Sequence, residues 1–398
     1  PLAAFRITVL QPMLGTLGAS FVQAFFLSFT DFGIPASVGG EFEVIASVLY
    51  DQMLGSIPNF HNGAVVSMTM LIPSVISIAL LRWLDKYSIR YSRIAPAELK
   101  RSPARDIIFG VLSVFICLSV LSVFAVIFVI PFLEDWPYQT QFTLEHVFSV
   151  FQDTELSNVY LNSLYVAFYT ALFGTLLVYG SALVTARSRL GRAMKQFVES
   201  VALITNTILG MVLGLSFLFA FSGTSLQGTF LIMVICNVIH YYSTPYLMMK
   251  ESLAKLNASW ETTAMLMGDS WLKTILRVIT PNALPTIIQV FSYYFINALV
   301  TVSAVIFLAG AQTMVITTKI KQLQYYNQFH EIFVLSLLLL LTNLTAKGFF
   351  TWISSKKART ADSKNTDGEK MVSVPGSIQT VRKLLGAVLA AVLLICAV

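Results

Sequence analysis

Long apolar stretches with almost no charge constrain this chain more than any other feature. Each is at least about 18 residues long, which is the length that a helix needs to cross the hydrocarbon core of a bilayer. The eight stretches lie roughly at 13–32, 60–82, 107–131, 158–184, 198–221, 228–248, 285–308 and 331–353. The sequence therefore predicts an all-α, polytopic membrane protein.

The overall composition supports a membrane protein. Of the 398 residues, 56% are hydrophobic and only 12% are charged. Soluble globular domains usually carry about 25% charged residues. The composition therefore disfavours a water-soluble enzyme, a disordered chain and a nucleic-acid-binding domain, and we expect no nucleic-acid partner.

The positions of the charges predict an orientation. Lys and Arg are absent between Arg6 and Arg82 and again between Arg105 and Arg187, and both gaps contain acidic residues. Basic loops face the cytoplasm in membrane proteins. The net charge of +6 thus reports orientation, with a weak attraction to anionic membrane lipid, and carries no information about a substrate. We expect 85–105, 188–196, 250–280 and 356–380 to be cytoplasmic, and 36–57 and 134–156 to lie outside.

A polar linker divides the chain into two membrane modules. Residues 83–106 are basic and contain Pro96 and Pro103, a composition typical of a cytoplasmic connector. Residues 1–82 are then the C-terminal part of a first module, and 107–355 form a second module with six helices.

The two ends of the chain give weaker signals. Residues 356–383 form a polar cytoplasmic tail, and the apolar run 384–398 begins either a further helix or a signal-like region. Because the first residue is Pro1 and not Met, we expect the chain to begin inside a longer protein. The three cysteines lie in apolar runs without metal-type spacing.

The most informative segment is the inner loop 249–284, which we call the coupling segment. Trp260, Thr263, Ala264 and Met267 recur at helical spacing, which predicts a short helix with one less polar face. Gly268 follows where helices often end in a left-handed residue. Asp269 or Ser270 is expected to cap a second short helix, and Pro281 to break it before the next span.

At these residues the chain resembles the permease subunits of bacterial ATP-binding-cassette importers. Their cytoplasmic loop carries a Glu-Ala-Ala motif, a Gly at the seventh position and then Ile-x-Leu-Pro. With Gly268 as anchor, Val278 and Pro281 take the Ile and Pro positions, whereas Glu261 lies one residue early. The resemblance implies contact with a partner ATPase, through Glu261, Thr262, Thr263, Ala264, Gly268, Val278 and Pro281.

The resemblance extends along most of the chain. Tyr160–Leu164 opens a span that ends at Thr185-Ala186-Arg187, and this span is similar to the family's second core helix. Leu27–Pro35 resembles the first half of fused, twelve-helix iron or phosphonate permeases. The resemblance implies two importer-type modules, the first truncated, in the bacterial cytoplasmic membrane. It also implies an ATPase dimer and an extracytoplasmic substrate-binding protein as partners.

The same resemblance suggests a cargo. The stretch from Asn297 through Ser303 to Leu308 is similar to the fifth core helix of 2-aminoethylphosphonate permeases, more than to that of ferric-ion permeases. A small organophosphonate is therefore the favoured cargo, and ferric ion is the next.

Two other classes of membrane protein were weighed. An intramembrane enzyme needs a cluster of catalytic or metal-binding side chains, and the four histidines form none along the sequence. An ion-coupled secondary transporter needs buried carboxylates, which the spans almost lack. The chain also contains no Gly-x4-Gly-Lys-Ser/Thr phosphate loop. We therefore expect a transport subunit and not an enzyme, with no cofactor and no metal, and ATP hydrolysis on a partner.

A few polar residues within or near spans leave two interpretations open. Asn297 and Ser303 line the substrate path or form hydrogen bonds between helices. The polar run that starts at Asn237 and includes His240 is a functional group or a solvated helix end, and the second is favoured. Lys319 and Lys321, in an outer loop, attract an anion at a gate or have no specific role.

Overall fold

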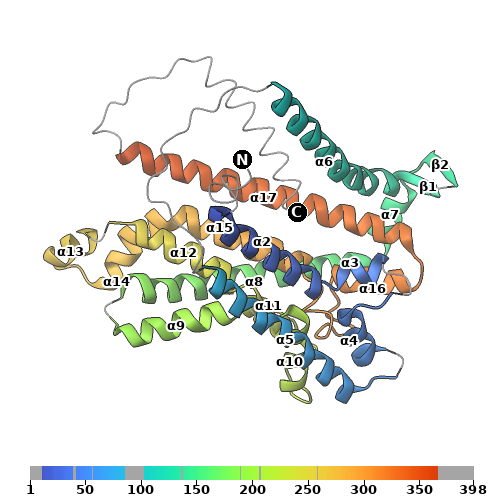
Figure 1. Cartoon of the computed structure of the whole chain (residues 1–398), viewed down its shortest axis with the longest axis horizontal. Helices are drawn as coiled ribbons and strands as arrows, with labels where there is room; N and C mark the ends of the chain where they lie inside the picture. The colour runs from blue at the N-terminus through green and yellow to red at the C-terminus, as the bar shows by residue number, and fades with distance from the viewer. Residues whose placement is uncertain are drawn as a thin grey trace. The chain divides into compact units, whose positions relative to one another are not determined.

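The computed structural model describes residues 11–38, 42–55, 57–85, 103–135, 138–188, 190–205, 208–257 and 259–365. These residues are almost entirely helical, which confirms the predicted all-α class (Figure 1). The described strands, β1 (Leu133–Asp135) and β2 (Gln139–Phe142), pair as a short antiparallel hairpin. The described part of the chain divides into two compact units, neither of which is one continuous stretch of sequence.

The first unit draws on Pro1–Lys100, Glu199–Ser243 and Thr301–Thr313. Its core joins Leu49, Met53, Met70 and Leu215 to Phe307. Regions far apart in the sequence thus share one core. Its helices are α2 (Gln11–Thr30), α3 (Gly33–Val38), α4 (Ile45–Leu54), α5 (Phe60–Asp85), α10 (Gly210–Ala220) and α11 (Phe230–His240).

The second unit draws on Arg101–Val198, Thr244–Val300 and Met314–Val398. The helices α8, α15 and α17 pack on one another in its centre, and Val159, Leu299 and Leu335 lie in their shared core. In Figure 1, α13 and α14 lie at one end of this unit, and α7 and α16 lie at the other. Its helices are α6 (Pro103–Val129), η2 (Ile130–Phe132), α7 (Glu145–Gln152), α8 (Thr154–Arg187), α12 (Ser243–Lys255), α13 (Ser259–Leu266), α14 (Trp271–Thr274), η4 (Ile275–Ile279), α15 (Thr280–Val300), α16 (Ile316–Tyr325) and α17 (Phe329–Asn365). A further helix, α9 (Arg192–Ile204), lies at the boundary between the units in the sequence.

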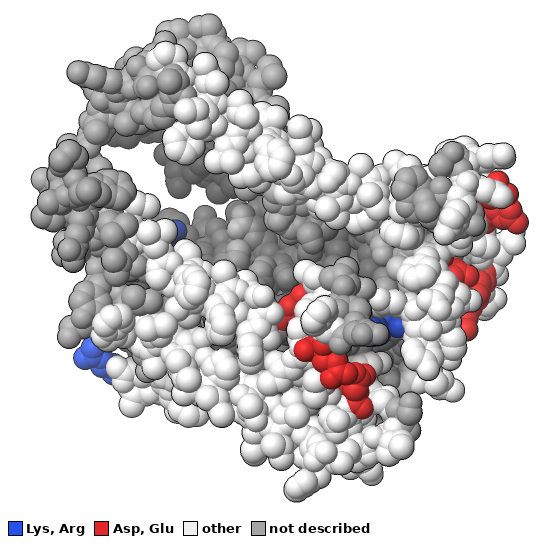
Figure 2. Space-filling view, turned by 45° about the vertical axis from the view of Figure 1, so that its right-hand side comes forward, with Lys and Arg blue, Asp and Glu red and all other residues white. Residues whose placement is uncertain are grey.

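Several helices are long and apolar enough to cross a membrane. Within the described residues the full-length candidates are Phe60–Ser77, Asp106–Phe132, Thr154–Arg187, Trp271–Val300 and Phe329–Lys357. The helices α11 and α12 meet the criterion only together, as one span bent at Tyr241 and Tyr242. The face drawn in Figure 2 is mostly uncharged where it is described. Such a surface suits contact with lipid.

Three predicted spans are interrupted in the structure. The stretch 198–221 forms parts of two helices, α9 and α10, and 228–248 is divided between α11 and α12. The stretch 285–308 is helical only to Val300, and turns follow. The prediction of continuous helices was wrong because hydropathy measures apolar composition, which is the same in a straight helix and in an interrupted one.

The end of the last span also differs from the prediction. The helix α17 continues from Phe329 to Asn365, so the first part of the predicted polar tail is helical. Most of the linker 83–106 and the whole apolar run 384–398 lie outside the described residues. The division into sequential modules stays a prediction.

Candidate functional site

The coupling segment contains the predicted helix, glycine turn and helix. The helix α13 is followed by Gly268, whose φ is +78°. The amide of Gly268 donates to the Met265 carbonyl at 3.0 Å, and the amide of Asp269 donates to the Ala264 carbonyl at 2.9 Å. These two bonds form a Schellman motif, in which a glycine takes the left-handed position. The predicted role of Gly268 in the backbone is therefore confirmed.

The second short helix begins as predicted but does not end at Pro281. The Ser270 hydroxyl accepts a bond from the Lys273 amide at 3.4 Å and caps α14. The helix then continues through the π-helical turn η4 into α15, so that Trp271–Val300 is one helical run. The predicted break was wrong because Pro281 lies in the first turn of α15, and the preceding π-helical turn accommodates the ring.

The outer surface of the coupling segment is apolar. Leu266 is 84% exposed and Met267 is 72% exposed, and Leu272 and Leu276 are each 61% exposed. Ala264, in contrast, is buried and anchors α13. Large exposed apolar groups on a helical projection are typical of a surface that docks on another protein or on membrane.

Arg187 joins the end of α8 to the coupling segment. Its side chain is only 6% exposed. Its Nε donates to the Leu253 carbonyl at 3.0 Å, and its Nη2 donates to the carbonyls of Leu253 and Leu256. Its Nη1 lies 3.6 Å from Oε1 of Glu261 on α13. One buried cation thus binds the carbonyl groups at the C-terminal end of α12 and the first turn of α13.

A second contact links α8 to the other side of the coupling segment. The Tyr179 hydroxyl lies 2.6 Å from Oγ1 of Thr280, at the start of α15. The Thr280 hydroxyl also donates to the Ile275 carbonyl at 2.9 Å. The helix α8 therefore holds both the entrance and the exit of the coupling segment.

The remaining predicted coupling residues are more exposed. Thr262 lies on the outer surface, and Thr263 donates its hydroxyl to the Ser259 carbonyl one turn earlier. The carbonyl of Val278 accepts a bond from the Asn282 side chain at 2.7 Å. Pro281 is exposed. The role of all these residues in ATPase contact stays a prediction.

A second group of polar residues lies in the first unit, and we call Asn237, His240 and Ser303 the polar cluster. Asn237 is fully buried, and neither of its amide atoms has a hydrogen-bond partner. Nδ1 of His240 is also buried without a partner. The favoured prediction of a solvated helix end was therefore wrong. The helix α11 ends at His240, and the buried atoms of Asn237 and His240 lie inside the first unit.

The two residues predicted for the substrate path have different surroundings. Asn297, in the second unit, donates its side-chain amide to the Tyr293 carbonyl of its own helix at 2.7 Å. Ser303, in the first unit, lies against Gly210, where a built Cβ would come within 2.4 Å of its Oγ. Their place on a substrate path stays a prediction.

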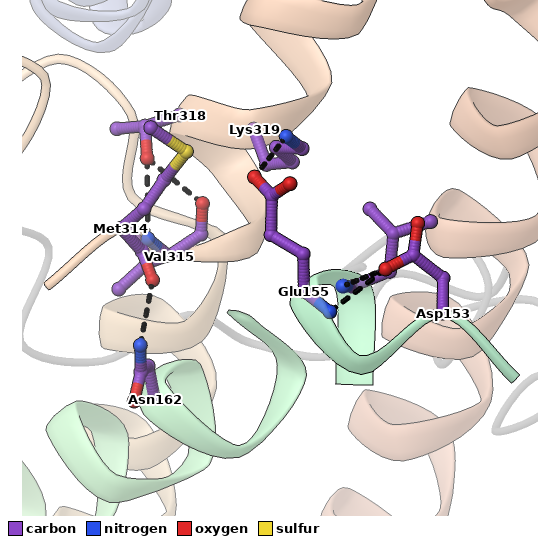
Figure 3. Close-up of polar contacts among 8 residues, drawn as sticks. Asp153, Glu155, Asn162, Met314, Val315, Thr318 and Lys319 are labelled. Atoms are coloured by element: carbon purple, nitrogen blue, oxygen red, sulfur yellow. Dashed lines mark hydrogen bonds and ion pairs between the residues drawn. The ribbon is translucent and has the colours of Figure 1, made fainter. Parts of the chain in front are cut away.

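The segment that leads into α16 is anchored on α8 (Figure 3). The Asn162 side chain donates to the Met314 carbonyl at 3.1 Å, and the Ser163 hydroxyl accepts from the Ile316 amide at 2.8 Å. Lys319 is buried, and its Nζ lies 2.5 Å from Oε1 of Glu155. The ammonium group of Lys319 therefore already has a carboxylate partner within the unit.

Comparisons with known proteins show which proteins this chain is similar to. Residues 179–359 match the family described as the binding-protein-dependent transport system inner membrane component. This range includes the C-terminal end of α8, the coupling segment and most of α17. Residues 179–359 are thus similar to an importer-type permease domain. The chain is therefore similar to transport subunits of the inner membrane.

Two curated relatives extend the similarity beyond the permease domain. The chain is 26% identical over 353 residues to the ferric transport system permease protein FbpB of Actinobacillus pleuropneumoniae, covering 85% of this chain and 50% of the relative. It is 26% identical over 314 residues to the putative ferric transport system permease protein FbpB 1 of Haemophilus influenzae, covering 75% and 48%. The chain therefore spans about half the length of the curated relatives it matches.

A solved structure supports the permease fold. A bacterial ATP-binding-cassette transporter involved in the import of the acidic polysaccharide alginate aligns with a TM-score of 0.52 and 15% identity. The alignment covers 64% of this chain and 96% of that one. At this identity the similarity concerns the fold alone.

Sequence reasoning missed two features of the permease. Arg187 was assigned to the end of a core helix but not to the coupling site, although its position at a helix end next to a cytoplasmic loop was a usable signal. The close approach of Ser303 to Gly210 could not be inferred, because the two residues are far apart in the sequence.

Proposed function

We propose that this chain forms part of the membrane pathway of an ATP-driven importer, and that the coupling segment docks on the partner ATPase. The observation that carries the proposal is the burial of Arg187 between α8, α12 and α13. A coupling segment that binds a moving ATPase has to transmit force to the membrane helices. The contacts of Arg187 join this segment directly to the core helix α8.

The docking surface is the exposed apolar face of α13 and α14. The Schellman turn at Gly268 holds the two short helices together, and Ala264 anchors the first of them. A groove on an ATPase would bury Leu266 and Met267, which are otherwise largely exposed. The Asp269–Lys273 ion pair is partly exposed beside this face and suits the rim of such an interface.

The proposal is tested by changing Leu266→Glu in the complete transporter, co-expressed with its partner ATPase. A charge placed in an apolar docking face should lower ATPase co-purification at least about tenfold, equivalent to about 1.4 kcal/mol. Leu144→Glu is the matched control, because Leu144 is also partly exposed and lies before α7. Equal capture of the ATPase by both variants would contradict the assignment of the docking face.

For the cargo, we propose a small organophosphonate, supported by the similarity of residues 297–308 to phosphonate permeases. Ferric ion is the second candidate, favoured by the names of the two curated relatives. A substrate-binding protein outside the membrane is expected to select the cargo by charge-assisted hydrogen bonds.

The choice between the two cargoes is tested on that binding protein. The purified protein is titrated by calorimetry with 2-aminoethylphosphonate and, separately, with ferric ion held as a soluble citrate complex. Binding of the phosphonate alone supports the first cargo. Binding of iron alone rejects the first cargo and supports the second, without affecting the proposed docking face.

A further inference from the structure

Three interrupted segments of the first unit meet at Gly210. The helix α10 begins there, α11 ends at His240, and a series of turns follows Val300. A Cβ built on Gly210 would lie 2.4 Å from Oγ of Ser303 and 3.0 Å from Cε1 of His240. The absence of a side chain at this position therefore allows all three segments to converge.

Two further contacts hold this convergence in place. The Tyr241 hydroxyl lies 2.6 Å from Oγ1 of Thr301, two residues before Ser303. A Cβ built on Gly214 would lie 2.2 Å from the Ala304 carbonyl oxygen, so the backbone of the turns lies directly on α10. Irregular backbone inside a membrane protein is tolerated where it is buried in protein or lines a polar cavity.

Several buried polar atoms near Gly210 have no hydrogen-bond partner within the protein. Asn237 is 0% exposed, with both amide atoms unpartnered, and it lies one turn before His240 on the same side of α11. Nδ1 of His240 is unpartnered as well. Buried polar groups without partners are uncommon in native proteins and call for a ligand, water or functional explanation.

The start of α10 adds backbone donors. The first intrahelical bond runs from the Leu213 amide to the Leu209 carbonyl, and no side chain caps the helix. The amides of Gly210, Met211 and Val212 therefore have no partner within the helix. A helix N-terminus with free amides and a positive dipole favours an anion.

The charges of the unit favour an oxyanion over a bare metal ion. The acidic residues in the described part of this unit are Asp31, Glu43, Asp51, Asp85 and Glu199, and none lies on α10, on α11 or in residues 301–313. Among the described residues, no group of three or more His, Cys, Asp or Glu side chains is placed to hold a metal ion. A multivalent cation at the polar cluster would have no carboxylate to balance its charge.

We propose that the polar cluster and the start of α10 bind the oxyanion headgroup of the cargo as it passes through the permease, with a phosphonate as the fitting class. This inference rests on the proposed importer function. The Ser303 hydroxyl, the imidazole and the Asn237 amide supply neutral donors, and the α10 amides supply the positive field. Because Ser303 and His240 pack directly against Gly210, the ligand enters when these segments separate.

The test measures uptake by the complete transporter in proteoliposomes with its ATPase and loaded binding protein. Asn237→Leu and Ser303→Ala are compared with Ser119→Ala. This variant is the matched control, because the Ser119 side chain is exposed and its hydroxyl donates to the Phe115 carbonyl of its own helix, α6. We expect Asn237→Leu to lower phosphonate uptake at least about tenfold and Ser303→Ala about threefold, while Ser119→Ala stays near the unchanged protein. Membrane abundance and ATPase co-purification verify that the variants fold.

The outcomes separate this inference from the proposed function. Normal phosphonate uptake by both Asn237→Leu and Ser303→Ala would overturn the site and leave the importer assignment intact. Uptake of ferric ion alone by the unchanged transporter would overturn the oxyanion class. No ATP-dependent uptake of either cargo by the unchanged transporter would overturn the proposed function itself.

Discussion

The coupling segment and the polar cluster differ in whether their buried polar groups have partners. In the coupling segment, Arg187 meets two carbonyl groups and a carboxylate, and Gly268 closes a helix with paired backbone bonds. In the polar cluster, Asn237 is buried with no partner for either amide atom. Oε1 of Glu261 accepts no hydrogen bond, but it lies in the ion pair with Arg187, so this buried carboxylate still has a charged partner. A region whose buried polar groups have partners is held rigidly, whereas buried polar groups without partners are suited to bind a ligand.

The largest effect is expected from Arg187→Leu, which would remove the hydrogen bonds and the ion pair that join α8 to the coupling segment. Removing the guanidinium leaves Glu261 and the α12 carbonyl groups without their partner, at a cost of about 3 kcal/mol. Thermal unfolding of the purified complex should move to lower temperature, and ATP hydrolysis should lose its stimulation by the loaded binding protein. Arg192→Leu, on the exposed start of α9, is the control. Identical behaviour of the two variants would show that Arg187 does not join the segments.

A somewhat smaller effect is expected from Gly214→Val in the first unit. The added side chain would collide with the Ala304 carbonyl, and such overpacking costs about 1–3 kcal/mol. Uptake should fall while the ATPase still co-purifies, because the coupling segment is unchanged. Gly180→Ala is the control, since a Cβ built there meets no atom within 4 Å. Normal uptake by Gly214→Val would mean that the turns need not lie on α10.

Gly268→Val should have an intermediate effect, confined to the coupling segment. A β-branched residue at positive φ costs about 1–2 kcal/mol, and Asn is tolerated better. Uptake and ATPase stimulation should therefore decrease in the order Gly268, Asn, Val, with membrane abundance preserved. Equal transport by all three proteins would remove Gly268 from the coupling mechanism.

The smallest effect is expected from Glu155→Gln. The Glu155 side chain is 66% exposed, and ion pairs that reach solvent contribute less than about 1 kcal/mol. The unfolding temperature of the purified complex should barely change, even though Lys319 is buried. A large loss of stability would mean that the outer loop depends on this pair far more than its exposure indicates.

Local sequence patterns predicted the coupling segment better than the polar cluster. The turn at Gly268 and the cap at Ser270 depend on neighbours within a few residues, so their spacing is visible in the sequence. The bonds of Arg187 reach residues 66 and 69 positions away, and no periodicity reports such contacts.

The positions of the spans were predictable from the local sequence, whereas the points where some of them are interrupted were not. Hydropathy located α5, α6, α8 and α17 correctly, because an apolar run of sufficient length is a property of the sequence itself. It did not locate the start of α10 or the end of α15. Those boundaries exist because Gly210 and Gly214 admit another segment, and this packing is decided only after the chain folds.

The uninterrupted helical run from Trp271 to Val300 has the length and continuity of a lever arm. At about 1.5 Å per residue, its 30 residues give an arm about 45 Å long. A tilt of about 5° at the docking end would then displace the far end by about 4 Å, more than the length of a hydrogen bond. The far end is covalently continuous with Thr301 and Ser303. A small rotation at the docking end of this one arm would therefore produce a displacement large enough to open or close the contact of Ser303 with Gly210, three residues beyond the tip of the arm.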